Sequence, residues 1–274
     1  MKRALLWSAA AILSILVTVL FSFPAAWLVP LMERKTGQHF TLADVQGTLW
    51  SGSGYLAIVN HSETLAASAT PTMPTTSVPL ILPGRFEWTL SPWVLLGEVD
   101  ARITNSQLLD HVLTVSGSWY RWQLGEFNLR LPASQLVLLG SPLNTLKPSG
   151  QMRLVAQSLT LISAAEGLEI LGAMQLNLTE IASALSPVKP LGNYRVEFEW
   201  QGKRAQLTLA TLSGALQLKG SGALDNGHMH FSGLAWALPE QEPRLTNLLN
   251  LLGRRHQVEN RNVFVIEFMY PSKN

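Results

Sequence analysis

The sequence predicts a mainly β protein: an N-terminal transmembrane helix, then a long, curved, mostly antiparallel sheet with a short C-terminal amphipathic helix. Residues 4–23 form an uncharged apolar run. After residue 40, short segments alternate apolar and polar residues, as half-buried strands do. Residues 243–253 carry an apolar stripe at helical spacing. With 274 residues, the chain can bury a sizeable core in one or two domains.

The first element is a predicted membrane anchor at residues 4–29. At about 1.5 Å per residue, the apolar run 4–23 just crosses a hydrocarbon core of roughly 30 Å. The run is longer than the roughly 7 to 15 residues usual for the core of a signal peptide. Pro24 also stands where a cleavage site needs a small residue. A cleaved signal peptide is the alternative to an uncleaved anchor.

The charges beside the apolar run predict its orientation. Lys2 and Arg3 lie in the predicted cytoplasmic tip, residues 1–3, because positive charge stays in the cytoplasm. The helical segment is expected to stop near Gly37. Residues 38–274 then form a periplasmic β-domain.

Strands are predicted next, most clearly at residues 194–200, where YRVEFEW alternates apolar and mostly charged side chains. The alternation at 264–270 is similar. Gly, Pro, Asn and Ser turn signals separate most of the strands. Further strands are predicted at 85–90, 98–104, 112–118, 127–131, 152–161, 168–178, 206–210, 215–220 and 229–234.

Two segments fall outside the strand pattern. Residues 61–79 are rich in Ser, Thr, Ala and Pro, which predicts a mobile loop between strands. Residues 243–253, PRLTNLLNLLG, form a predicted helix with Pro243 in its first turn. Leu245, Leu248 and Leu249 share its apolar face, which is expected to pack on the sheet.

The stretch GTLWSGSGYL at 47–56 places glycines around a tryptophan. It fails as a phosphate-binding loop because no Lys-Ser/Thr pair follows, and it lacks the Gly-x-Ser-x-Gly of a nucleophile elbow. We therefore interpret it as structural, with glycines that bend the first strand and large side chains that pack. The motif residues are Gly47, Leu49, Trp50, Gly52 and Gly54.

Composition excludes several function classes. Twenty basic residues against 18 acidic ones, scattered along the chain, do not make the dense basic face of a nucleic-acid binder. The absence of cysteine excludes disulfides, thiolate metal sites and cysteine nucleophiles. No cofactor motif occurs.

Three residue sets invite a chemical interpretation, but each has a simpler one. His228 and His230 share a strand face as metal ligands would, but a half-exposed hairpin face is the favoured interpretation. Glu197 and Glu199 lie on a polar strand face rather than in a site that separates their pKa values. We predict no catalytic or metal site and no enzyme. An aromatic groove for an apolar ligand, as opposed to ordinary sheet packing, would draw on Trp88, Trp93, Trp119, Trp122, Trp200 and Trp236.

Several stretches together resemble the type II secretion system protein N family, the GspN family. After the predicted anchor, GTLWSGSG at 47–54 is similar to its G-T-L-W-x-G stretch. FEWTLSPWVLLG at 86–97 is similar to its W-x-L-x-P-x-x-L-L-x-G segment. The residues in matching places are Trp88, Pro92, Leu95, Leu96 and Gly97. Further similar stretches are LNTLKPSGQMRL at 143–154, LGNYRVEFEW at 191–200, GALQLKGSGAL at 214–224 and PRLTNLLNLLG at 243–253.

The resemblance implies a non-enzymatic, single-pass protein of the bacterial inner membrane with its bulk in the periplasm. It implies an accessory role in exporting folded proteins across the outer membrane, with other secretion subunits as partners. A more distant similarity to AsmA-like proteins keeps a second hypothesis open, a periplasmic lipid-binding or lipid-transfer module. The resemblance transfers no catalytic residue.

Overall fold

The computed structural model describes most of the chain as two compact units, Met1–Gln107 and Leu108–Asn274. The division lies inside the predicted β-domain 38–274. The predicted loop 61–79 and much of the predicted anchor lie outside the described residues. The described residues are 7, 11, 14, 18–37, 40–58, 80–139, 143–164, 167–226, 228–258 and 261–270.

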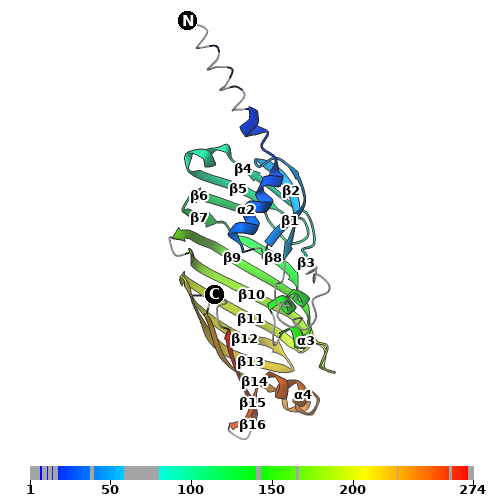
Figure 1. Cartoon of the computed structure of the whole chain (residues 1–274). Coiled ribbons are helices and arrows are strands. Elements are labelled where there is room, and N and C mark those ends of the chain that lie inside the picture. The colour runs from blue at the N-terminus through cyan, green and yellow to red at the C-terminus, as the bar shows by residue number, and fades with distance from the viewer. Residues whose placement is uncertain are drawn as a thin grey trace, which may run out of the picture. The chain divides into compact units, whose positions relative to one another are not determined.

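The first unit is a small antiparallel sheet preceded by a short helix (Figure 1). Its strands are hydrogen-bonded in the order β1-β2-β4-β5, and β3 pairs with the far end of β2. The elements are η1 (Ala25–Trp27), α2 (Leu28–Lys35), β1 (Phe40–Gly47), β2 (Ser51–Ile58), β3 (Leu80–Ile81), β4 (Phe86–Leu90), η2 (Pro92–Leu96) and β5 (Glu98–Thr104).

Within the predicted anchor 4–29, the helix is interrupted at residues 22–24. The helix assignment ends at Phe21, and Pro24 then forms a β-bridge with Thr48. Proline has no N–H to extend the helix, so the chain turns here into η1 and α2. Within the described residues, none of the helices combines the length and apolarity that crossing a bilayer requires. The anchor at 4–29 therefore stays a prediction.

The GTLWSGSGYL stretch turns the chain between two strands, whereas the sequence predicted a bend within one. Gly47 pairs with Gly52 across the β1–β2 hairpin, and the Thr48 N–H donates to the Ser51 carbonyl. Gly47 has a φ of 87°, and a Cβ there would lie 2.5 Å from the Ser51 oxygen. The glycine pattern alone does not distinguish a bend within one strand from a turn between two strands, because both need flexible glycines at the same positions.

Arg85 fixes a bulge in this hairpin. The register of β1 on β2 shifts between Ala43 and Gln46. Asp44, in the bulge, has a φ of 48°. Arg85 donates to the Asp44 carboxylate at 2.6 Å and to its backbone oxygen at 2.6 Å. The hydrogen bond from Arg85 lowers the pKa of the Asp44 carboxyl.

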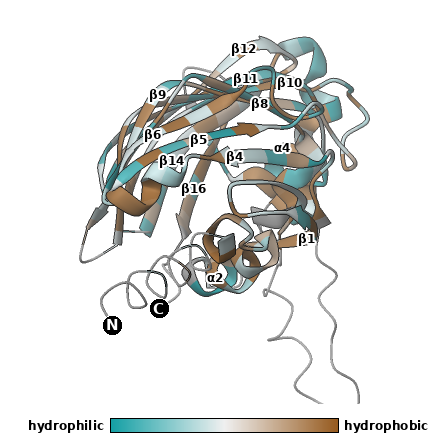
Figure 2. Cartoon of the chain, turned by 90° about the horizontal axis from the view of Figure 1, so that it is seen from above, coloured by the Kyte–Doolittle hydropathy of each residue, from teal (hydrophilic) through white to brown (hydrophobic). Residues whose placement is uncertain are grey.

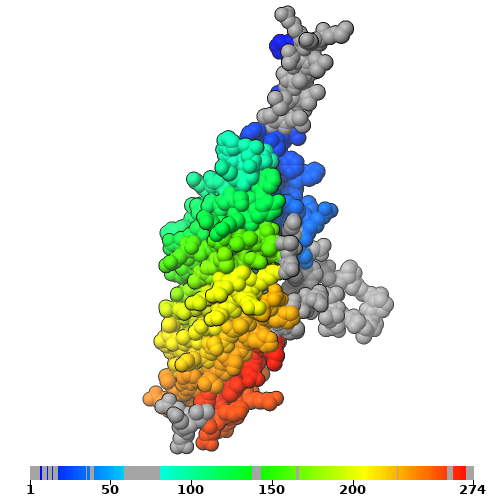
Figure 3. Space-filling view, turned by 90° about the vertical axis from the view of Figure 1, so that its left-hand side faces the viewer, coloured from blue at the N-terminus to red at the C-terminus, as the bar shows by residue number. Residues whose placement is uncertain are grey.

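The second unit is a long, open, antiparallel sheet, which confirms the predicted fold class in this part. The strands run β6-β7-β9-β10-β11-β12-β13-β14-β16-β15, with β8 also on β9. In Figure 3 they follow one another as bands from green through yellow to orange. The strands are β6 (Leu113–Ser118), β7 (Arg121–Leu124), β8 (Phe127–Pro132), β9 (Pro148–Ala164), β10 (Gly167–Ser183), β11 (Gly192–Gly202), β12 (Arg204–Gly214), β13 (Leu216–Asp225), β14 (His228–Ala237), β15 (Arg254–Val258) and β16 (Arg261–Tyr270).

Short helices complete the second unit. The predicted C-terminal helix is confirmed as α4, one residue earlier at each end than predicted. Figure 2 shows the strands as a single curved layer, with α4 against it. The helices are η3 (Ala133–Leu139), α3 (Leu143–Leu146), η4 (Pro239–Gln241) and α4 (Glu242–Leu252).

A bulge in β9 keeps the apolar side chains of this strand on one face. Ala156 pairs with Met174 and Leu159 pairs with Gly172, so Gln157 and Ser158 together oppose one residue of β10. Ala156 and Leu159 are three positions apart, so in a regular strand without a bulge they would lie on opposite faces. The bulge thus explains why the apolar alternation of the sequence shifts by one position between Ala156 and Leu159.

Candidate functional site: an apolar sheet face

The main candidate site is one face of the second unit's sheet, where three cross-strand rows carry no charged residue. We call it the apolar face. Residues directly opposite in antiparallel strands lie on the same side of a sheet, so the register defines each row. The first row reads Phe127, Ala156, Met174, Phe198, Leu207, Gly222, Phe231 and Phe268.

Two further rows flank the first. The second row reads Leu129, Leu154, Leu176, Val196, Leu209, Gly220, Gly233 and Ile266. The third row reads Leu124, Leu159, Gly172, Trp200, Ala205, Leu224 and Met229. Each of the first two rows therefore continues across eight strands.

The opposite face of the same strands is polar. Its central row reads Gln175, Glu197, Thr208, Ser221, Ser232 and Glu267. Glu197 and Glu199 are exposed there, as a solvated face requires. The contrast shows that these rows separate apolar from polar side chains from β10 to β16.

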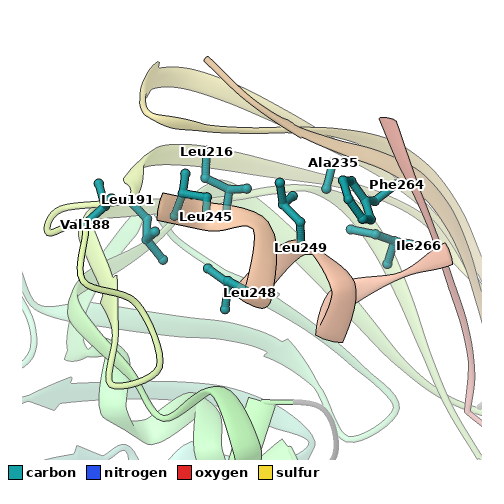
Figure 4. Close-up of a cluster of buried hydrophobic side chains, with 9 residues drawn as sticks. All are labelled: Val188, Leu191, Leu216, Ala235, Leu245, Leu248, Leu249, Phe264 and Ile266. Atoms are coloured by element: carbon teal, nitrogen blue, oxygen red, sulfur yellow. The ribbon is translucent and has the colours of Figure 1, made fainter. Parts of the chain in front are cut away.

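Helix α4 covers the C-terminal end of the apolar face. Leu245, Leu248 and Leu249 point from α4 toward the sheet, where they meet Leu216 and Phe264 (Figure 4). All three leucines are at most 3% exposed. Two of the sheet positions there, Phe231 and Phe268, stack with ring centroids 6.2 Å apart. This end of the face is therefore a closed core.

Helix η3 covers a second part of the face. Ala133 and Leu136 pack against Ile181 and Tyr194. The Tyr194 hydroxyl donates to the Leu216 carbonyl at 3.1 Å, and burial raises the pKa of this hydroxyl. Tyr194 thus joins two strands from within the core.

Between the covered parts, side chains of the apolar face stay half-buried. Leu176, Val196 and Leu209 of the second row, and Phe198 of the first, keep partial contact with solvent. The Trp200 indole N–H is buried and finds no acceptor among the described residues. Such groups usually have an acceptor.

The six tryptophans of the alternative aromatic groove do not come together. Trp122 and Trp200 lie on the apolar face, three strands apart, whereas Trp236 pairs with Gln217 on the polar face. Trp93 and Trp119 are 62% and 52% exposed. Trp88, in the first unit, donates to the Leu49 carbonyl. The surface is built instead from leucine, valine and phenylalanine. The alternation within each strand predicts which of its side chains are apolar on one side. Only the register shows which of these side chains lie next to one another in a single surface.

The other sequence candidates are dispersed. The residues of the Gly47 to Gly54 motif lie in the hairpin turn and the start of β2, where Trp50 is 8% exposed. His228 and His230 are exposed on the polar face of β14, opposite Asp225 and Ala223. Within the described ranges, no three histidine, aspartate or glutamate side chains group closely enough to hold a metal.

A single-layer sheet with a wide apolar face defines the class of protein: an open antiparallel β-sheet protein with one apolar and one polar face. The chain belongs to the type II secretion system protein N family, because a family model described as "Type II secretion system (T2SS), protein N" matches residues 38–261. No curated protein and no solved structure matches the chain. The match confirms the resemblance and identifies a component of a type II secretion system. Such a component interacts with other subunits of that system.

Proposed function

We propose that this chain is an accessory component of the type II secretion system that helps export folded proteins from the periplasm across the outer membrane. It is held in the bacterial inner membrane by one anchor at residues 4–29, with the β-units in the periplasm. It acts through contacts between proteins and has no catalytic role. The proposal rests on the middle of the apolar face, where the side chains are only half-buried. Large apolar surfaces that stay accessible to solvent mark interaction sites.

Photo-crosslinking in cells that contain the whole secretion system tests this proposal. A photoreactive residue replaces Val196 on the apolar face. In the matched control it replaces Glu197, the next residue on the polar face of the same strand. We expect an adduct with another secretion subunit at position 196 and much less at 197. Equal labelling at both positions, or no secretion subunit in either adduct, would contradict the proposal.

A second candidate function, lipid binding or lipid transfer, is favoured by the same uncharged rows and by the Trp200 indole, which has no acceptor among the described residues. A lipid offers acyl chains for the rows and ester carbonyls for the indole. Native mass spectrometry of the full chain in mild detergent tests it. Val196→Arg should lose bound lipid, whereas Glu197→Arg should retain it. If both variants keep the same lipid, or the unchanged chain carries none, the lipid function fails.

A further inference from the structure

The connection between β4 and β5 presents an exposed apolar tip. Helix η2 has the sequence PWVLL, and Trp93, Leu95 and Leu96 are 62%, 47% and 74% exposed. None of its five residues is polar or charged. Large apolar side chains gathered on one exposed turn are unusual for a surface that faces only water.

The tip is held in shape at both ends. The Ser91 hydroxyl accepts a hydrogen bond from the Trp93 N–H, which caps the start of η2. Gly97 closes it with a φ of 101° and donates to the Val94 carbonyl at 3.2 Å. A Cβ on Gly97 would meet no atom within 4 Å, so glycine is needed there for backbone conformation. The exposed side chains therefore stand on a preformed turn.

Hydrogen bonds through Trp50 connect the tip to the end of the predicted anchor. The Trp50 indole donates to the Leu20 carbonyl at 2.8 Å. The Leu90 N–H, just before η2, donates to the Trp50 carbonyl at 2.7 Å. In Figure 1 the teal turn between β4 and β5 lies at the end of the first unit where the dark blue residues enter. Two hydrogen bonds through Trp50 thus link Leu20 to Leu90, which lies two residues before the start of η2.

We infer that η2 inserts into the bilayer surface beside the anchor, as a second membrane contact. This inference rests on the anchor proposed above, because the anchor brings Leu20 to the bilayer. Tryptophan is enriched at membrane interfaces, and leucine side chains gain from leaving water. Phe21 and Trp27, both within the predicted anchor 4–29, are 54% and 65% exposed and add apolar side chains at its end.

The lack of cysteine allows a direct test with the full chain. Leu96→Cys carries an environment-sensitive fluorophore, and the protein is reconstituted into phosphatidylcholine vesicles. Ile81→Cys is the matched control, because Ile81 is apolar and 53% exposed but pairs near the opposite end of β2. We expect blue-shifted emission at position 96, quenched by spin-labelled lipid, and water-like emission at 81. High salt should leave the shift unchanged because the tip is uncharged.

Three results would overturn the inference. Water-like emission at position 96 in protein that floats with the vesicles would refute the tip contact and leave the anchor intact. A blue shift that spin-labelled lipid does not quench would assign the tip to a protein contact. Failure of the chain to float with vesicles at all would refute the anchor, and the tip contact with it.

Discussion

At the scale of single residues, Trp50 is the position where the sequence suggested a role and the structure defines it. The sequence indicated bulk for packing between glycines. The structure adds that Trp50 lies at the hairpin turn and binds the end of the predicted anchor through its indole. Its ring lies 6.3 Å from that of Phe21. Sequence could not reveal this, because residues 20 and 50 meet only through tertiary folding.

We expect Trp50→Ala to destabilise the chain by roughly 3 to 5 kcal/mol, because the ring is almost fully buried. Urea unfolding of the full chain in detergent measures the change. Trp50→Phe should retain most of the packing and lose mainly the hydrogen bond to Leu20. A loss below about 1 kcal/mol for Trp50→Ala would show that the ring contributes little to stability.

Tyr194 predicts a pH dependence. Burial raises the pKa of its hydroxyl in the folded state, so the folded state retains the proton more strongly than the unfolded state. Its contribution is fully present below the unfolded pKa of about 10 and is lost as pH rises above that value. Tyr194→Phe should therefore lose less stability than the unchanged chain between neutral and strongly alkaline pH. Parallel pH profiles of urea unfolding for both proteins would contradict this.

At the scale of elements, alternation predicted most strands but not where they bulge. The strand expected at 152–161 extends over Pro148–Ala164 because it pairs along its whole length with β10. Strand β7 was missed because four residues carry too short a pattern. The bulge at Gln157 and Ser158 is a property of two strands together, so it appears only once β10 is in register.

Deleting Gln157 tests the bulge. The deletion leaves only Ser158 between Ala156 and Leu159, so ordinary alternation should keep Leu159 on the apolar face, opposite Gly172, and the fold should be retained. Gln157→Ala is the control. Gln157 is exposed, so this substitution should change stability by less than about 0.5 kcal/mol. Thermal unfolding measures both variants, and a loss of about 2 kcal/mol or more in the deletion variant alone would refute the role of the bulge, because it would mean that large buried side chains had changed face.

Helix α4 offers a matched pair of leucines. Leu249 is 1% exposed and packs in the core under the helix, whereas Leu251 is 48% exposed. Leu249→Ala should cost about 2 to 5 kcal/mol, and Leu251→Ala less than about 0.5 kcal/mol. Denaturant unfolding measures the difference. A large effect of Leu251→Ala would mean that another part of the chain covers the outer face of α4.

At the scale of the whole molecule, the family and the predominance of strands could be predicted from sequence, but the apolar face could not. Each strand showed its own apolar side, and the tryptophans drew attention because they are large. Which residues form one surface depends on eight pairings between the second unit's strands. Leu176 and Leu209, for example, join through Val196.

The N-terminus of the mature protein decides between anchor and signal peptide. An uncleaved anchor predicts that protein from membranes begins at or next to Met1. Cleavage after Ala26 would instead remove Leu20, and with it the acceptor for the Trp50 indole. Intact-mass measurement of the protein from membranes distinguishes the two. A mature chain that begins near residue 27 would overturn the anchor.

The rows of the apolar face have a length as well as a chemistry. Neighbouring strands lie about 4.8 Å apart, so a row across eight strands measures about 34 Å. An occupant along a row meets one residue from each strand, and the gain in contact grows with the number of strands it crosses. Each additional hairpin would lengthen the row by about 10 Å. Because α4 covers the C-terminal end of the rows, the length that stays open to an occupant is shorter than the full row.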